Sequence, residues 1–542
     1  MTAPAVPAPP ASADVGEAVE LRGAPKPWWA IAALVTALAA YGGWLAWFVA
    51  DHSGALYDDA YIYFRYADNL LQGCGLRFNC ADAPVEGFTS PLYLLLLTLA
   101  GGLGAALPTS ALWLGTVSTW AAVAVAMVLA YRVAKPAGPW PARLAAVATA
   151  VALTDHFWLL NAVTGLETPL AAVAVAAVGL ALHQQRFVKT AIFLAWLIRP
   201  EAAAFGIALL VSRRYLSVRW LLPLAVAVGA VVLMRLGIFG DWLPNTARAK
   251  AGGSMAHLRL GVAYLLETVQ LFPLVMLAPL AGLAATPWRD PPPELQQERQ
   301  ALTVWLTGAA LWLLLLVWAG GDHFAYGRLL APLVPAATAL GSAALARGLL
   351  RLGGPSRWLR ADLGPLTAAT LVAAWGFAEH RLQPNHGFDN VQRWSKLGDY
   401  LKRTFPGATV ATVPIGAIAY HSGLRVIDLV GLTQPAIARG GATVPPAKLV
   451  RNWIGHEREH TAWVLAQKPE VIALTRFAAA PWMSLQQARA GFWAEWQLLR
   501  AVKQGRAPYV VHSAEIEPGV YGLLLVLRPP EVAAPEVAAP EE

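Results

Sequence analysis

The nine residues DDAYIYFRY, Asp58 to Tyr66, follow directly on the first long apolar run of the chain, Trp28 to Ala50. A run of that length is typical of a membrane-spanning helix, so the chain delivers two adjacent carboxylates to the membrane edge. Ionisable residues at that depth are functional candidates, and Asp58 and Asp59 are therefore the candidate catalytic residues. The plainer alternative is a solvated loop in which an aspartate caps the next helix.

The composition indicates a polytopic α-helical membrane protein. The 542 residues are 57% hydrophobic and only 14% charged, and the mean hydropathy is +0.48, whereas about a quarter of a soluble chain is charged. Apolar runs of roughly 18–22 residues recur along it. The net charge of +8 is explained by Lys and Arg in cytoplasmic loops, so no nucleic-acid partner is expected.

The positive charges also predict a topology. Arg22 and Lys26 precede the first span, which places the N-terminus in the cytoplasm and Asp58-Asp59 outside. The piece 91–107 is broken by glycines and is expected to be interfacial or re-entrant. About eleven spans are then expected, at 28–50, 111–131, 144–160, 169–182, two short pieces between 186 and 214, 220–239, 262–285, 301–319, 329–345 and 363–377. The predicted location is a bacterial inner (plasma) membrane, with the site and the C-terminal domain periplasmic.

Short, punctuated apolar runs predict a small α/β domain after the last span. The predicted domains are a disordered N-terminus 1–27, a transmembrane domain 28–377 with a catalytic first outer loop 51–110, an extracytoplasmic α/β domain 378–528, and a disordered tail 529–542. The predicted strands are 408–413, 425–429, 471–475, 509–512 and 521–527, and the predicted helices are 391–403 and 485–496. Cys74 and Cys80 both lie in the first outer loop, where a disulfide and two free thiols both stay open.

Acids and bases together occupy the loops that this topology places outside. An acid can deprotonate an acceptor hydroxyl or steady positive charge at an anomeric carbon, and Arg and Lys can hold a phosphate. The pattern predicts transfer of a group from a lipid phosphate. The candidate donor-phosphate ligands are Lys250, Arg328, Arg248 and Arg65. The candidate substrate-binding residues are Glu86, Glu167, Arg199, Glu201, Asn245, Asp322 and His323.

Each of these residues also has a structural explanation. Glu167 can simply cap a helix, and Asn245 after a proline is a turn signature. Arg199 and Glu201 can form a structural ion pair. The two cations Arg248 and Lys250 can snorkel to the interface or bind lipid headgroups without chemistry. The pair Asp322-His323 can bind a metal, although no further His stands at ligand spacing.

Several of these motifs resemble a known family of membrane glycosyltransferases. The first outer loop, from Asp58 through 85–89 (Val-Glu-Gly-Phe-Thr), is similar to that of the GT-C superfamily. More narrowly, it resembles the branch that contains the mycobacterial terminal β-(1→2)-arabinofuranosyltransferase and the pilin arabinosyltransferases. The later motifs that agree are 165–169, 199–201, Arg235 with 240–246 and Lys250, 320–322 with Arg328 and Pro332, Gly416, Tyr420, 422–423, 427–429, 431–433 and 456–457. Cys74 departs from the family pattern, which often has His there.

The resemblance implies a polyprenyl-phosphate sugar donor such as decaprenyl-phosphoryl arabinose, an inverting transfer at the periplasmic face, and Asp58 or Asp59 as base. The acceptor would be a glycan, a lipid-linked glycan or a pilin-like protein, and membrane lipids are the other partners. Another sugar such as mannose stays open, as does a need for a divalent cation; no other cofactor is indicated. A sugar-lipid flippase would instead distribute ionisable residues through the membrane depth. A non-catalytic lipid-binding scaffold would leave the two aspartates without a role.

Overall fold

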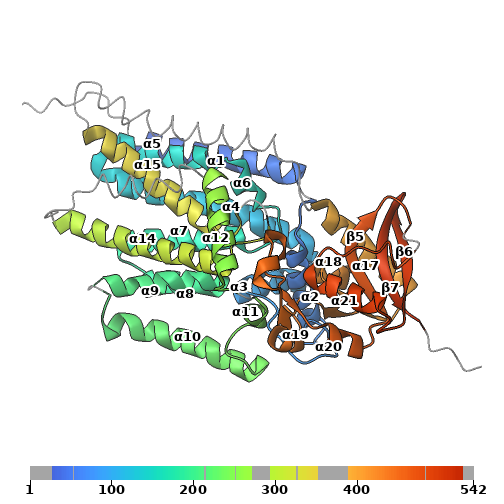
Figure 1. Ribbon diagram of the computed structural model, residues 1–542. Coiled ribbons are helices and arrows are strands. Elements are labelled where there is room, and N and C mark those ends of the chain that lie inside the picture. Colours follow the sequence, from blue (N-terminus) through green and yellow to red (C-terminus); the bar gives the residue numbers. More distant parts are fainter. Residues whose placement is uncertain are drawn as a thin grey trace, which may run out of the picture.

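The computed structural model describes residues 27–528 except 53, 213–214, 251, 272–292, 325–326, 352–387 and 482–483. The predicted span at 363–377 and the tail 529–542 therefore lie outside the described residues, as does the N-terminal segment up to residue 26. Within the described part, a bundle of helices is followed by a mixed α/β unit at one end of the bundle (Figure 1).

The bundle is formed by helices that lie side by side along a common direction (Figure 1). Its helices are α1 (Pro27–Asp51), α4 (Leu107–Ala134), α5 (Pro139–Ala152), α7 (Thr168–Gln184), α8 (Val188–Ile198), α9 (Ala203–Ala208), α10 (Val218–Phe239), α14 (Pro293–Ala319) and α15 (Val334–Arg351). Ala122, Ala126 and Ala130 stand four residues apart on α4 and are fully buried. Small side chains at this spacing let neighbouring helix backbones approach closely, and α4 packs against α5, α7 and α15.

Four described helices are long and apolar enough to cross a membrane: Leu34–Asp51, Leu107–Ala137, Val218–Phe239 and Gln296–Ala319. The expected count of about eleven spans is therefore not reached in the described part of the chain. The helix α3 (Pro91–Gly102) has 12 residues, or about 18 Å at 1.5 Å per residue, less than the ~30 Å of a hydrocarbon core. The predicted span at 144–160 is also divided, into α5 and the short helix α6 (His156–Leu160).

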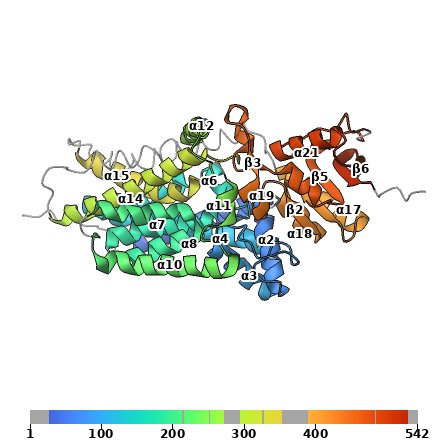
Figure 2. The same cartoon turned by 60° about the horizontal axis from the view of Figure 1, so that its bottom comes forward.

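Helix α12 (Met255–Leu271) runs across the bundle rather than along it, as both views show (Figures 1 and 2). The prediction of a span that starts at residue 262 is not confirmed for the described part, 262–271, while 272–285 lie outside the described residues. A close approach explains the packing: a Cβ at Gly261 would lie 2.4 Å from the carbonyl oxygen of Val317 on α14. Arg259 and Glu267 on the exposed side of α12 also disfavour a lipid-buried course.

The C-terminal unit contains a five-stranded sheet in the order β2-β1-β5-β7-β6. Its strands are β1 (Thr409–Thr412), β2 (Arg425–Asp428), β5 (Val471–Ala478), β6 (Tyr509–Glu517) and β7 (Val520–Leu527), and a small hairpin joins β3 (Ala442–Thr443) to β4 (Arg458–Glu459). β1 pairs in parallel with β2 and β5, whereas β7 pairs antiparallel with β5 and β6. All five strands expected from the apolar runs are confirmed.

Helices cover this sheet, and they agree only in part with the prediction. They are α17 (Phe388–Thr404), α18 (Ile415–Ser422), α19 (Pro435–Gly440), α20 (Thr461–Ala466) and α21 (Trp493–Lys503). The helix expected at 485–496 begins only at Trp493, because the Glu495 carboxylate accepts hydrogen bonds from the backbone N–H groups of Gly491 and Phe492. That arrangement fixes a helix start.

Candidate active site

The first carboxylate of the pair, Asp58, is bound by the C-terminal unit. It opens helix α2 (Asp58–Leu71), and its two oxygens accept hydrogen bonds from the backbone N–H groups of Gly416 (3.0 Å) and Ala417 (2.8 Å), at the start of α18. Only glycine fits at 416, because a Cβ there would lie 1.9 Å from the Asp58 carbonyl oxygen. Burial raises the pKa of Asp58 to about 7, although the hydrogen bonds from these two N–H groups stabilise the carboxylate and act to lower it.

Arg65 binds the other end of the same helix and is not placed to bind a donor phosphate. Its guanidinium donates to the carbonyl oxygens of Ala419, Gly423 and Leu424 and to that of Phe78. Asp58 and Arg65 are seven residues apart on α2, as are Gly416 and Gly423 at the two ends of α18. The two helices therefore run in parallel, with a negative charge at the N-terminus of α18 and a positive charge at its C-terminus, as the helix dipole favours. The prediction for Arg65 is corrected for this reason.

The second carboxylate, Asp59, faces a cation instead of a helix end. Arg328 Nη1 donates to Asp59 Oδ2 at 3.1 Å, and the same guanidinium donates through Nε to Asp322 Oδ2 at 2.6 Å. The Asp59 side chain keeps 30% of its surface exposed, and Oδ1 receives no hydrogen bond from the described residues. Burial opposes ionisation of Asp59, but Arg328, His323, His456 and Lys250 outweigh it and lower its pKa.

Aromatic rings and histidines surround the Asp59–Arg328–Asp322 group. The Phe324 ring lies under the Arg328 guanidinium, 3.9 Å from ring centre to carbon. His323 is edge-on to His456 of the C-terminal unit, with ring centres 4.5 Å apart. Burial and the neighbouring His456 and Arg328 lower the pKa of His323 to about 3, so this ring is neutral near pH 7. Burial likewise opposes ionisation of Asp322, but Arg328 and His323 outweigh it and hold its pKa at about 2.

Lys250 and Arg248 differ in the way they are paired. Lys250 is exposed and makes no hydrogen bond or ion pair with the described residues. Its positive charge nevertheless contributes to lowering the pKa values of Asp59, Glu201 and Asp322. Arg248 is held by Asp241, with contacts of 2.9 and 3.2 Å. The guanidinium of Arg248 has a carboxylate partner outside the Asp59 group, so its role as a phosphate ligand stays a prediction, whereas Lys250 has no such partner in the described part of the chain.

Three further predicted residues form one buried ionic group. Arg199 donates to Glu167 (2.8 Å) and to Glu201 (2.6 Å). Arg199 and Glu167 are 7% and 3% exposed, so neither reaches a substrate from its present position. Glu201 is more open, with 20% of its side chain exposed. Burial opposes ionisation of Glu201, but the charges of Arg199 and Lys250 outweigh it and lower the pKa of this carboxyl group.

Glu86 and Asn245 connect elements and are not placed to contact a substrate. Glu86 accepts three hydrogen bonds of 2.9–3.1 Å from Arg235 on α10. Asn245 is the first residue of the short helix α11 (Asn245–Ala249). Its side-chain amide donates to the carbonyl oxygens of Gly431 and Leu432 after β2, both at 2.8 Å. Both side chains are buried, and the prediction that they bind substrate is corrected to this structural role.

His456 and the N-terminus of α18 belong to the site but are absent from the sequence-based residue set. The motif 456–457 carries a signal, since it is among the landmarks of the resemblance, but nothing local indicates that it meets His323. Among the residues that the structure describes, no group of three or more His, Cys, Asp or Glu could hold a metal ion.

Comparisons with known proteins give a fold-level similarity of low degree. Residues 379–515 match the model of a domain of unknown function, DUF8728. No curated protein sequence matches the chain. The chain is similar to the crystal structures of ArnT from Cupriavidus metallidurans, bound to undecaprenyl phosphate (14% identity, TM-score 0.49, 95% of this chain and 100% of that chain) and in the apo state (14%, 0.47, 92% and 97%).

A third similar structure is the oligosaccharyltransferase of Archaeoglobus fulgidus in the apo form. The identity is 12% and the TM-score 0.45, over 90% of this chain and 73% of that chain. Identities this low, with TM-scores below 0.5, establish neither a shared activity nor shared site residues.

Proposed function

We propose that this chain is a membrane glycosyltransferase of the GT-C type, which moves a sugar from a polyprenyl-phosphate donor to an extracytoplasmic glycan or protein acceptor. One observation carries the proposal. At the end of an apolar helical bundle, the partly exposed carboxylate of Asp59 lies among Arg328, neutral His323 and Lys250, a cation that has no ion-pair partner among the described residues. A base and a free cation at the depth of a lipid phosphate are the two groups that such a transfer needs. The resemblance of the first outer loop favours arabinofuranose as the sugar.

The two adjacent aspartates would divide the work. Asp59 has an oxygen without a hydrogen-bond partner in the described part of the chain, so it is the proposed catalytic base. Asp58 uses both oxygens to hold the start of α18, so it is a positioning residue that fixes the C-terminal unit against α2.

The proposed reaction is a single displacement. Asp59 takes the proton of an acceptor hydroxyl while that oxygen forms a bond to the anomeric carbon. The bond from the anomeric carbon to the phosphate oxygen breaks, and its electron pair leaves with the polyprenyl phosphate. Lys250, and Arg328 behind it, stabilise the added negative charge on the leaving phosphate. A phosphate there also competes with Asp59 for Arg328, which would raise the basicity of Asp59 when the donor is bound.

The division between the aspartates predicts a pH profile. A base must be ionised to act, so activity is retained above its pKa and falls below it. With Asp59 as base, whose pKa lies below the usual value, kcat/KM is expected to be nearly flat from pH 8 to pH 5. With Asp58 as base, whose pKa is about 7, kcat/KM would instead fall about tenfold per pH unit below pH 7. Measuring kcat/KM from pH 5 to pH 8 distinguishes the two.

Removing the unpaired cation predicts a second outcome. Lys250→Gln is expected to raise the donor KM and lower kcat/KM about tenfold to a hundredfold, since a charge-assisted contact to phosphate contributes about 1.5–3 kcal/mol. Arg248→Gln is the control, because Arg248 is already paired with Asp241, and it is expected to change kcat/KM less than threefold. Equal losses in both variants would contradict the assignment of Lys250.

The sugar is tested by supplying membranes that contain the protein with radiolabelled decaprenyl-phosphoryl arabinose or with the corresponding mannose donor. We expect transfer of arabinose into a larger product. Transfer of mannose alone would keep the proposed class and change the sugar, whereas no transfer from either would count against the class. The proposed arrangement places the site and residues 378–528 on the outer face of a bacterial inner membrane, with the transmembrane domain at 28–377.

A further inference from the structure

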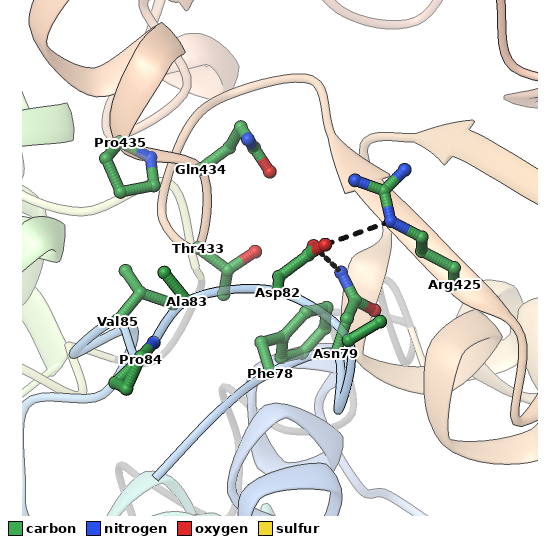
Figure 3. A pocket seen from close by; sticks show the side chains of 11 residues that line it. Phe78, Asn79, Asp82, Ala83, Pro84, Val85, Arg425, Thr433, Gln434 and Pro435 are labelled. Carbon is green, nitrogen blue, oxygen red and sulfur yellow. Dashed lines mark hydrogen bonds and ion pairs between the residues drawn. The ribbon is translucent and has the colours of Figure 1, made fainter. Parts of the chain in front are cut away.

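A pocket of about 390 Å³ lies between the first outer loop and the C-terminal unit, and its lining includes no residue of the Asp59 group. Its walls come from 78–79 and 81–85 of the loop and from Arg425 with 433–435 of the C-terminal unit (Figure 3). The volume falls within the ~300–1,000 Å³ of small-molecule sites. No residue of this pocket takes part in the proposed transfer step.

The pocket is built to be rigid on the loop side. Cys74 and Cys80 form a disulfide, with Cα atoms 5.2 Å apart, and Cys80 stands between the lining residues Asn79 and Ala81. Asn79 pairs with the backbone of Val426 in β2 in both directions, donating at 2.9 Å and accepting at 3.0 Å. Asp82 accepts from Asn79 and from Arg425 Nε, at 2.9 and 3.0 Å. The loop is thereby joined to the edge of the sheet by these hydrogen bonds.

Several polar groups of the pocket keep hydrogen-bonding capacity. The side-chain amide of Gln434 makes no hydrogen bond with any described residue and is directed to the space in front of Thr433 and Asp82 (Figure 3). The two Nη groups of Arg425 likewise have no partner in the described part of the chain, because only Nε is bonded to Asp82. Thr433 donates its hydroxyl to Asp428 and retains lone pairs to accept a bond.

The charge of the lining identifies the class of ligand. Asp82 and Arg425 are the charged residues of the pocket, and they cancel as an ion pair of 3.0 Å. A pocket without net charge offers little to a phosphate or a carboxylate, whereas amide, guanidinium and hydroxyl groups together suit a neutral compound rich in hydroxyl groups. Phe78, Val85 and the prolines 84 and 435 supply an apolar surface beside these groups. This combination fits a sugar residue.

The position of the pocket relates it to the transfer site. The Tyr66 hydroxyl donates to the carbonyl oxygen of Val85, which lines the pocket, at 2.7 Å. Tyr66 stands seven residues after Asp59 on α2, or about 10 Å along the helix axis. This spacing along α2 is of the size of a few sugar residues, which is the ground for relating the pocket to an inner residue of a glycan whose terminal hydroxyl lies at Asp59.

We infer that this pocket is an acceptor subsite that binds an inner sugar residue of a neutral oligosaccharide, so that the acceptor is an extended glycan rather than a single sugar. The inference rests on the proposed function, because it takes Asp59 as the point of transfer. It assigns Gln434 and Arg425 to recognition of the acceptor and leaves the donor to Lys250 and Arg328.

The test compares acceptors of two lengths with the full-length protein in lipid nanodiscs. The probes are octyl arabinofuranoside and the octyl glycoside of a linear arabinofuranose tetrasaccharide. The wild type is expected to have a KM about tenfold lower for the tetrasaccharide. Gln434→Ala is expected to raise the tetrasaccharide KM about two- to tenfold, the effect of one lost hydrogen bond, and so to reduce the difference in KM between the two probes. Gln434→Trp fills the pocket and is expected to make the two KM values equal.

The control is Gln467→Ala, an exposed glutamine at the end of α20 in the same unit, which is expected to leave both KM values unchanged. Binding is also measured without turnover, by saturation-transfer NMR of the tetrasaccharide with the Asp59→Asn protein, and the signal is expected to decrease with Gln434→Trp added. Equal KM values for the two wild-type probes, or a binding signal that Gln434→Trp does not change, would overturn the inference while leaving the proposed function intact. No transfer to either probe, with tetrasaccharide binding retained, would contradict the proposed function instead.

Discussion

Replacing Asp59 by Asn is expected to lower kcat for sugar transfer about 10²–10⁴-fold, the contribution of a well-placed general base. The amide has nearly the same shape as the carboxylate and its oxygen can still accept from Arg328, as Asp59 Oδ2 does now. It has little capacity to accept a proton from an acceptor hydroxyl. The measurement is the single-turnover rate with saturating donor, together with the melting temperature, which is expected to change by no more than a few degrees.

The matched variant is Asp58→Asn, which is expected to behave differently. An amide has one oxygen for the two backbone N–H groups of Gly416 and Ala417 that Asp58 now satisfies. One of these donors would lose its partner, at about 1–3 kcal/mol, so the melting temperature is expected to fall and activity to fall through misplacement of α18. An Asp59→Asn protein with transfer within tenfold of wild type would contradict the assignment of the base.

Replacing Arg199 by Met is expected to cause the largest loss of stability among single changes near the site. Arg199 is the shared partner of Glu167 and Glu201, and the central pair is buried. Removing one partner of a buried ion pair costs about 3–5 kcal/mol, because the remaining charge has no compensation. The measurement is the denaturation midpoint of the purified protein in detergent.

Two further variants give this prediction its control and its rescue. Arg186→Met removes an exposed arginine at the end of α7 and is expected to change stability by less than about 0.5 kcal/mol. The triple variant Arg199→Met with Glu167→Gln and Glu201→Gln removes the uncompensated charges and is expected to regain much of the loss. A single Arg199→Met variant as stable as Arg186→Met would show that the ionic group does not hold this part of the bundle.

Local patterns were sufficient to predict the strands of the C-terminal unit. Each of the five is a short apolar run bounded by turn residues, and β1, β2 and β5 have the continuous burial of strands covered on both faces. The order of the strands in the sheet is not encoded in such runs. Helix α18 was missed because its eight residues are too few for a clear helical period.

Apolar runs predict more membrane spans than the described residues confirm, for a physical reason. A run of 14–18 apolar residues fits a short span, a helix buried among other helices, or a helix that crosses a bundle. α5 and α12 are of this kind. What distinguishes them is packing, such as the contact of Gly261 with Val317, and packing depends on residues distant in the sequence.

The composition of the site could be predicted, but the pairing of its charges could not. The sequence places acids and bases in the same set of loops, yet it cannot tell that Arg328 contacts Asp59 across 269 positions or that Asp58 meets Ala417 across 359. Arg65 and Arg248 were predicted to be available for a phosphate, because the sequence does not show which carbonyl and carboxylate groups they contact in the folded protein. The three-dimensional pairing leaves Lys250 available, and this is the basis for its proposed role.

The most direct test of the central claim measures both products of one reaction. Purified protein in nanodiscs receives a decaprenyl-phosphoryl donor with ³H in the sugar and ¹⁴C in the lipid, together with the tetrasaccharide acceptor. We expect free ¹⁴C decaprenyl phosphate and ³H-labelled acceptor to appear in equal amounts with the wild type, and Asp59→Asn to reduce both at least a hundredfold. Label in neither product with arabinose and mannose donors alike, or equal rates in the wild type and Asp59→Asn, would contradict the assignment of Asp59 as the base of a sugar transfer.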